Sequence, residues 1–307
     1  MVEQQQNNNT QKHTMVRTRN SVKRLKVASA LFSPDVVFLL AALLDARDLS
    51  QASLTCKALG GKQAAYNGLS LAEEAARRLF ECASGWERSC LPKRDDEGWV
   101  ELYRHLLMLR SKLTFDQLVG FHISYEEGFS GEDLSTVQTS PDQLSEVTAL
   151  CSNHTMRAGR HFAVFTQGDG AHGMIGIMRP VQLNGSRFGR FAEFGPSNGM
   201  YRSFLRSKRT DRWSDSSVHC CGVWSTFDEV YWQDWKRETQ TKKIDGLGPD
   251  VVQSGIPIGL LLDLDEGALS VYQNGERLAV AKDGLSGEYC WYTELYIGGS
   301  FVTIQRG

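Results

Sequence analysis

Residues 261–278 read LLDLDEGALSVYQNGERL, and this stretch decides the fold of the second half of the chain. Two short segments, Asp265-Glu266-Gly267 and Asn274-Gly275, interrupt it. Asp, Asn and Gly tolerate the positive φ angles that tight hairpin turns require. The apolar run from Ile258 to Leu264 has the length of a strand that is buried on both faces. The stretch therefore predicts three strands joined by two tight turns.

Similar short segments recur from about Val119 to the end of the chain, where Gly, Ser and aromatic residues become frequent. Strands are predicted at residues 120–125, 145–151, 160–167, 173–178, 219–225, 258–264, 268–273 and 290–297. Many short strands separated by turns favour two antiparallel sheets packed as a sandwich.

Residues 30–112 carry the periodicity of helices instead. Ser33 suits the cap of a first helix, and the spacing of Ser70 and Glu73 is that of a capping box. Asp96 is expected to open the last helix of this region. Helices followed by strands without alternation predict the α+β class.

The length and composition set limits on what the protein does. A chain of 307 residues with 41% hydrophobic residues is typical of two packed domains. We predict a basic polar tail at 1–27, a helical domain at 28–112 and a sandwich at 118–307. A net charge of −2 gives no general attraction to nucleic acid or membranes.

Seven cysteines are scattered without a C-x-x-C pair, and the N-terminus has no apolar signal-type stretch. This usage favours reduced thiols in the cytoplasm, with the nucleus as the alternative. Neither a metal site nor a cofactor is predicted, because no ligand cluster or dinucleotide loop is found.

The 258–278 stretch resembles the SPRY family, whose most recognisable run is L-L-D-L-D-x-G-x-L-S-V/F-Y-x-N-G. Gly159-Arg160-His161-Phe162 resembles the opening of a core strand in that family, and residues 173–177 resemble its I-G-I strand. The resemblance covers about 118–304. It implies a β-sandwich that binds protein or peptide segments through loops at one edge and has no catalytic activity.

Exposed aromatic and arginine side chains on a rigid frame are typical of such binding edges. The first candidate segment, 226–254, joins two predicted strands and carries Tyr231, Trp232 and Trp235 among many charges. These rings serve either as target anchors or as packing against the sandwich. We expect one tryptophan to be buried and the other exposed.

The second candidate segment, residues 200–214, is rich in basic residues. Arg206, Arg209 and Arg212 would suit an acidic or phosphorylated target. The alternative is a solvated loop that binds nothing.

Residues 31–59 resemble an F-box. Asp45-Ala46-Arg47-Asp48-Leu49 matches its D-x-x-D-L link, and residues 52–59 match its V-C-K-x-W close without the tryptophan. The family's Leu-Pro opening is also absent. The resemblance implies docking to a Skp-type adaptor of a cullin ubiquitin ligase through Phe32, Val36, Leu40, Leu43, Leu44, Leu49, Leu54, Cys56 and Lys57. The alternative is a helical hairpin that packs on the sandwich.

Together these observations predict a non-catalytic adaptor of a cullin-type ubiquitin ligase, whose SPRY-like part recruits a target protein. One alternative is a SPRY interaction scaffold without a ligase link. A minor alternative is a carbohydrate-acting β-sandwich enzyme that uses Asp263, Asp265 and Glu266, although a tight turn explains these residues equally well.

Overall fold

The computed structural model gives the chain in atomic detail over most of its length. It describes residues 33, 36, 39, 44, 46–55, 57–128, 131–142, 145–168, 173–183, 194–224, 229–236, 240–244, 256–296 and 298–307.

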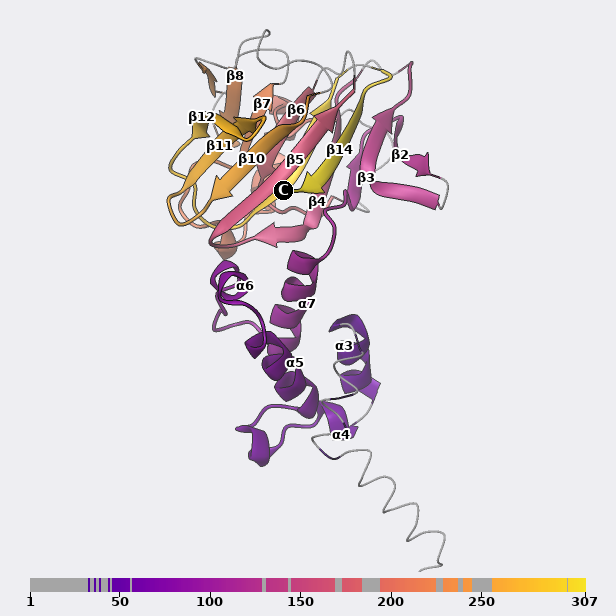
Figure 1. Cartoon of the computed structure of the whole chain (residues 1–307), viewed down its shortest axis with the longest axis vertical. Coiled ribbons are helices and arrows are strands. Elements are labelled where there is room, and N and C mark those ends of the chain that lie inside the picture. The colour runs from indigo at the N-terminus through magenta and orange to yellow at the C-terminus, as the bar shows by residue number, and fades with distance from the viewer. Residues whose placement is uncertain are drawn as a thin grey trace, which may run out of the picture. The chain divides into compact units, whose positions relative to one another are not determined.

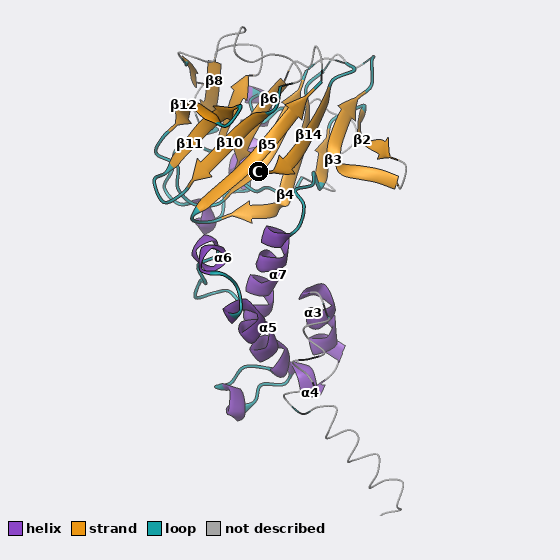
Figure 2. Cartoon of the chain, viewed as in Figure 1, coloured by secondary structure: helices purple, strands orange, loops and turns teal. Residues whose placement is uncertain are grey.

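The chain divides into two compact units, Met1–Leu79 and Phe80–Gly307. The helices of residues 46–110 come first along the chain and the strands follow, with one further short helix, α8 (Arg202–Ser207), among the strands (Figures 1 and 2). The change from helix to strand falls between Arg110 and Gln117, as the sequence predicts. The division into units lies earlier, inside helix α5 (Leu71–Glu81).

Every described strand pairing is antiparallel, and the strands form two sheets. The first sheet has the order β1 (Gln117–Val119), β4 (Val147–Met156), β13 (Tyr289–Leu295), β6 (Gly173–Met178), β7 (Cys220–Trp224), β8 (Glu229–Gln233) and β9 (Gln240–Lys243). The second has the order β12 (Glu276–Lys282), β11 (Ala268–Gln273), β10 (Ile258–Asp263), β5 (Arg160–Gln167), β14 (Phe301–Arg306), β3 (Gly131–Thr139) and β2 (Ile123–Gly128). The α+β class with an antiparallel sandwich is confirmed.

The decisive stretch folds as predicted. Strands β10, β11 and β12 pair in chain order, and the turns between them contain Gly267, Asn274 and Gly275 at φ of 68°, 53° and 81°. These angles lie in the left-handed region that Gly and Asn adopt most readily. Within β10 only Leu261 is not buried, so the strand is covered on both faces.

The central strands β13 and β6 of the first sheet are buried on both faces, whereas its edge strand β9 is exposed. On one face Trp291 joins the core between the sheets and meets Phe165 edge to face at 6.1 Å. On the other face Tyr292 joins a second apolar cluster that includes Tyr201 and Leu205. Alternate residues of β13 therefore serve different cores, as strand geometry requires.

The described helices of the N-terminal unit begin where capping residues predict. Ser33 Oγ accepts a hydrogen bond from the Val36 N–H at 3.4 Å, and Ser70 Oγ accepts one from the Glu73 N–H at 3.1 Å. Residues that follow Ser70 at helical spacing are buried. The elements of this unit are α3 (Ala46–Thr55), α4 (Lys57–Gly60), the 3-10 helix η1 (Ala64–Tyr66) and most of α5.

Two further helices, α6 (Gly85–Cys90) and α7 (Trp99–Arg110), belong to the sandwich unit. Helix α7 has Gly98 as its N-cap and does not begin at Asp96 as predicted. Leu102 and Leu106 are fully buried on the side of α7 that the sequence assigns to packing. The helix packs against β4.

Several strand predictions are wrong. The strand predicted at 120–125 does not include residues 120–122. Gly120 and His122 have positive φ, and a Cβ at Gly120 would lie 2.6 Å from Val147 Cγ1. Residues 226–254, expected as a loop, contain β8 and β9. Strands β1, β3 and β14 are missing from the prediction.

Candidate functional site

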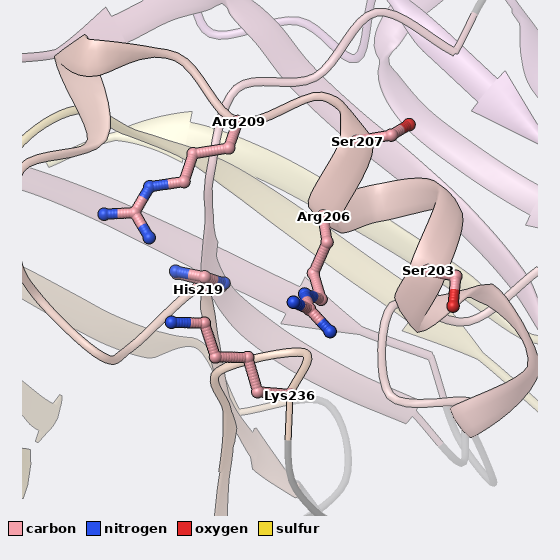
Figure 3. Close-up of a pocket in the computed structure, with 6 residues that line it drawn as sticks. All are labelled: Ser203, Arg206, Ser207, Arg209, His219 and Lys236. Atoms are coloured by element: carbon pink, nitrogen blue, oxygen red, sulfur yellow. The ribbon is translucent and has the colours of Figure 1, made fainter.

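A pocket of about 500 Å³ on the sandwich unit is lined by basic and hydroxyl side chains. In Figure 3 the side chains of Arg206, Arg209 and Lys236 lie around the His219 ring, whereas the Ser207 hydroxyl points away from it. The lining residues are Ser203, Arg206, Ser207, Arg209, His219 and Lys236, and we call this set the basic pocket.

Helix α8 (Arg202–Ser207) forms one side of the basic pocket. Asn198 caps the preceding 3-10 helix η2 (Gly199–Tyr201) by accepting a hydrogen bond from the Met200 N–H at 3.1 Å. Tyr201 and Leu205, four residues apart, are buried beneath the helix. Ser203, Arg206 and Ser207 are exposed. The buried pair anchors α8 to the sheet and leaves Ser203 and Arg206 exposed to a ligand, while the Ser207 hydroxyl donates to the Phe204 carbonyl at 2.6 Å.

The turn after β8 presents Lys236 from another direction. Trp235 has a φ of 53°, a conformation that costs a bulky residue about 1–3 kcal/mol. Its indole is fully buried and donates a hydrogen bond from Nε1 to the Pro196 carbonyl at 3.1 Å. Asp234 Oδ1 accepts from the Lys236 N–H at 2.8 Å. Burial of the indole offsets the strained backbone and fixes the turn.

His219 forms a rigid wall of the basic pocket. It is 3% exposed, and its ring lies 5.4 Å from the Trp213 ring and 5.0 Å from the Trp235 ring. Among the described residues, none forms a hydrogen bond with its Nδ1. Burial, with smaller contributions from Arg179 and Arg209, lowers the pKa of His219 to about 4. The imidazole is therefore neutral at pH 7.

The side chains that line the basic pocket carry only positive charge. Arg206, Arg209 and Lys236 are exposed, and no lining residue is acidic. Within the described part of the chain, no carboxylate forms a salt bridge with any of the three. Arg209 Nη2 donates only to the Ser214 carbonyl, at 3.2 Å. An anion is the ligand that this arrangement favours.

The structure brings together two of the three arginines expected to bind a target. Arg206 and Arg209 share the basic pocket. Arg212 lines a neighbouring pocket of about 290 Å³, where it lies 3.4 Å from an Asp96 oxygen and 3.7 Å from a Glu101 oxygen. Arg212 is already paired with carboxylates, so it is less available to an acidic target. Target binding by Arg206 and Arg209 stays a prediction.

The aromatic residues expected at the binding edge have other roles. Tyr231 is 3% exposed and Trp235 is fully buried. Trp232 is partly buried, with Lys282 Nζ 5.2 Å from its ring centroid. We expected one tryptophan to be buried and the other exposed: Trp235 is buried, but Trp232 is half-buried and packs against the core rather than being exposed. Tyr231 and Trp235 are too buried to serve as exposed anchors. Tyr231 and Trp232 lie on β8 and Trp235 follows it, so all three rings pack against the apolar clusters.

Four lining residues were missed by sequence reasoning. Ser203 and Ser207 carry no signal beyond their position beside the arginines. His219 stands beside Cys220 and Cys221 in the sequence, and nothing in that neighbourhood indicates an anion site; the side chains of both cysteines are also buried. The residues that surround His219 in space come from separate segments of the chain. Lys236 likewise lies far from Arg206 and Arg209 in the sequence.

The described residues of the F-box-like segment include two exposed leucines. Leu54, a predicted adaptor contact, is 84% exposed, and Leu39 is 71% exposed. Leu49 is 1% exposed, so it serves packing. Val36 and Leu44 are half-buried. Phe32, Leu40, Leu43 and Cys56 lie outside the described residues, and the side chain of Lys57 is not described.

A second group of charged residues in the sandwich unit is buried and paired. Arg157 Nη1 lies 2.7 and 2.9 Å from the two Glu97 carboxylate oxygens, and Arg157 Nε lies 3.4 Å from a Glu288 oxygen. Glu97, Glu101 and His105 each offer one potential metal-ligand atom, and these three atoms lie within 4.8 Å of one another. The Arg157 guanidinium already pairs with the Glu97 carboxylate. We therefore interpret Glu97, Glu101, His105, Arg157 and Glu288 as a structural network and call these five residues the buried charge network.

The carboxylates considered for glycosidase chemistry hold the chain in place. Asp263 Oδ1 accepts from the N–H groups of Asp265 and Glu266 at 3.1 and 3.0 Å, and Asp263 Oδ2 accepts from Arg160 Nε at 2.7 Å. Asp265 Oδ1 accepts from the Gly159 N–H at 2.9 Å. These bonds favour the turn role over a catalytic pair.

No family model and no curated protein matches the chain. Similar solved structures include the PSpry domain of TRIM65 (16% identity, TM-score 0.41, covering 66% of this chain and 94% of that one) and the SPRY domain of human HERC1 (12%, 0.36, 60% and 94%). A third is the carbohydrate-binding module CBM66 from Bacillus subtilis (10%, 0.31, 64% and 91%). At these TM-scores the similarities assign neither family nor function. In the described part of the chain, no helix is long and apolar enough to cross a membrane.

Proposed function

We propose that the sandwich unit is a SPRY-type interaction domain that holds an acidic or phosphorylated segment of a target protein in the basic pocket. The observation that carries the proposal is the convergence of Arg206, Arg209 and Lys236 without a carboxylate partner among the described residues. Charged groups left exposed and unpaired on a rigid frame add little to stability, so their convergence points to binding.

Photo-crosslinking from the pocket tests this proposal. The full chain carries p-benzoylphenylalanine in place of Ser203, which is exposed on α8. The same photo-crosslinker in place of Arg277, an exposed residue of β12, is the matched control. We expect a protein adduct from position 203 that is absent from position 277 and is lost when Arg206 and Arg209 are changed to Gln. An adduct that survives R206Q/R209Q would contradict the proposal.

We further propose that the N-terminal helices dock a Skp-type adaptor and so link the bound target to a cullin ubiquitin ligase. Two leucines with most of their surface in solvent, Leu39 and Leu54, support this second step. Exposed leucines on helices suit a groove formed by a partner's helices. The ligase link would act by proximity, because it raises the local concentration of target lysines. A scaffold without the ligase link is the alternative.

A surface substitution separates these two readings. Leu54→Asp places a charge where solvent already reaches, so the fold should be retained. Ala65→Asp, at another exposed position of the N-terminal unit, is the control. Co-purification should lose the Skp-type adaptor and cullin with L54D, keep them with A65D, and keep the Ser203 crosslink in both. If neither Skp-type adaptor nor cullin co-purifies with the unsubstituted chain, the scaffold alternative holds.

A further inference from the structure

We infer that the basic pocket recognises a phosphate monoester, the side chain of a phosphorylated serine, threonine or tyrosine in the target. This inference rests on the proposed function and narrows its ligand from any acidic segment to a phosphorylated one. Three independent properties of the pocket distinguish a phosphate group from a carboxylate, namely its charge, its number of donors and one buried nitrogen.

The charge of the pocket matches a dianion. Arg206 comes from α8, Arg209 from the turn after it and Lys236 from the turn after β8, so three cations reach one space from three places in the chain. A phosphate monoester carries a charge of about −1.5 to −2 at pH 7, whereas each carboxylate carries one. A single phosphate group can balance most of this positive charge in a way that one carboxylate cannot.

The number of hydrogen-bond donors also exceeds what a carboxylate accepts. Two guanidinium groups and one ammonium line the pocket together with the Ser203 hydroxyl, whereas the Ser207 hydroxyl already donates to the Phe204 carbonyl at 2.6 Å. Phosphate presents three terminal oxygens in a tetrahedral arrangement, and guanidinium groups bind such oxygens in pairs. The volume of about 500 Å³ accommodates the phosphorylated side chain together with part of the peptide backbone.

The buried imidazole supplies the third property. His219 Nδ1 is buried with no hydrogen-bond partner among the described residues, and the Trp213 and Trp235 rings, which also contact each other, pack against the imidazole. A buried nitrogen without a partner is costly, and a ligand that completes its hydrogen bonding removes that cost. A phosphate oxygen that accepts from this nitrogen must displace the atoms that now cover it. A ligand that reaches His219 would therefore gain affinity from a hydrogen bond that the ring lacks in the free protein.

Degenerate peptide libraries test the inference on the full chain. Four fluorescein-labelled libraries share random flanks and carry phosphoserine, phosphotyrosine, an Asp-Glu pair or serine at the centre. Fluorescence anisotropy is measured for the unsubstituted protein, R206Q, K236Q and the charge-matched control R277Q. We expect at least one phosphorylated library to bind at least tenfold more tightly than the Asp-Glu library. R206Q and K236Q should each weaken that binding at least tenfold, and R277Q should change it less than twofold.

The outcomes separate this inference from the proposed function. Equal binding of phosphorylated and Asp-Glu libraries, weakened in both cases by R206Q, would overturn phosphate recognition and support the broader acidic target. Binding of phosphorylated libraries that R206Q and K236Q leave unchanged would overturn the assignment to this pocket. If no library binds, phosphate recognition is overturned, and the Ser203 crosslink alone then decides the proposed function.

Discussion

The sandwich unit uses arginine in two contrasting ways. In the buried charge network, Arg157 has no exposed side-chain surface and meets Glu97 at 2.7 Å. In the basic pocket, Arg206 and Arg209 are exposed and no described carboxylate pairs with them. The same side chain stabilises the fold in the first region and leaves charge available for a ligand in the second. Burial and pairing, rather than residue type, decide which role an arginine has.

The comparison has an energetic basis. Removing one member of a buried ion pair leaves the other charged in a medium that solvates it poorly. Removing a charge that water already solvates changes the free energy of unfolding little. The two regions should therefore respond in opposite ways to neutral substitutions, one in stability and the other in binding.

The largest effect is expected in the buried charge network. Glu97→Gln leaves Arg157 with Glu288 alone, and we expect the free energy of unfolding to fall by about 3–5 kcal/mol. Urea denaturation measures the change. Asp96→Asn is the control, because the Asp96 side chain is 70% exposed and its loss should cost under about 0.5 kcal/mol. A loss under about 1 kcal/mol for E97Q would show that the network is not structural.

Acidification should weaken the fold through histidines that burial keeps neutral. Burial is the largest cause of a pKa lowered to about 2 for His105, about 3 for His154 and about 4 for His161 and His219. Below about pH 6.5 the unfolded chain binds protons at these rings and the folded chain does not. Stability is therefore lost as the pH falls. Between pH 7 and 5.5 each histidine should cost about 1 kcal/mol.

Urea denaturation at pH 7 and 5.5 checks this dependence. His105→Gln should reduce the difference between the two pH values by about one histidine's share, about 1 kcal/mol. The carboxyl groups of Glu74 and Glu87, whose pKa is lowered to about 2 mainly by hydrogen bonds to arginine, contribute only below about pH 4.5. An unchanged stability between pH 7 and 5.5 would contradict the neutral burial of these rings.

The smallest effect on stability is expected in the basic pocket. R206Q/R209Q should change the free energy of unfolding by less than about 0.5 kcal/mol, because both side chains are exposed. Urea denaturation of R206Q/R209Q and of E97Q compares the two changes in the free energy of unfolding. A loss of several kcal/mol would mean that the pocket arginines stabilise the fold, and the distinction between the two regions would fail.

Much of the fold could be predicted from local signals. The turn residues around Gly267 and Gly275 allowed strands β10, β11 and β12 to be predicted. The spacing of Ser70 and Glu73 predicted the start of α5. Strand β3 was missed because its sequence, GEDLSTVQT, is largely polar. The break at Gly120 depends on the nearby Val147 side chain, a contact that sequence periodicity does not report.

The candidate site was less predictable because it depends on tertiary packing. Arg206 and Arg209 could be found from a cluster of basic residues in one segment. The roles of Trp235 and His219 depend on a positive φ and on an aromatic cluster built from Trp213, His219 and Trp235. Tyr231 looked like a surface anchor because the surrounding charges are visible in the sequence and the sheet that buries it is not.

Nuclear magnetic resonance of the histidine rings tests the central claim most directly. Inorganic phosphate is titrated into the ¹⁵N-histidine-labelled full chain at pH 7 and constant ionic strength. The account predicts a saturable shift of the His219 ring nitrogens that is lost in R206Q, while His105 in the buried charge network does not respond. Unchanged His219 resonances, or the same shift in R206Q, would contradict phosphate binding in the basic pocket.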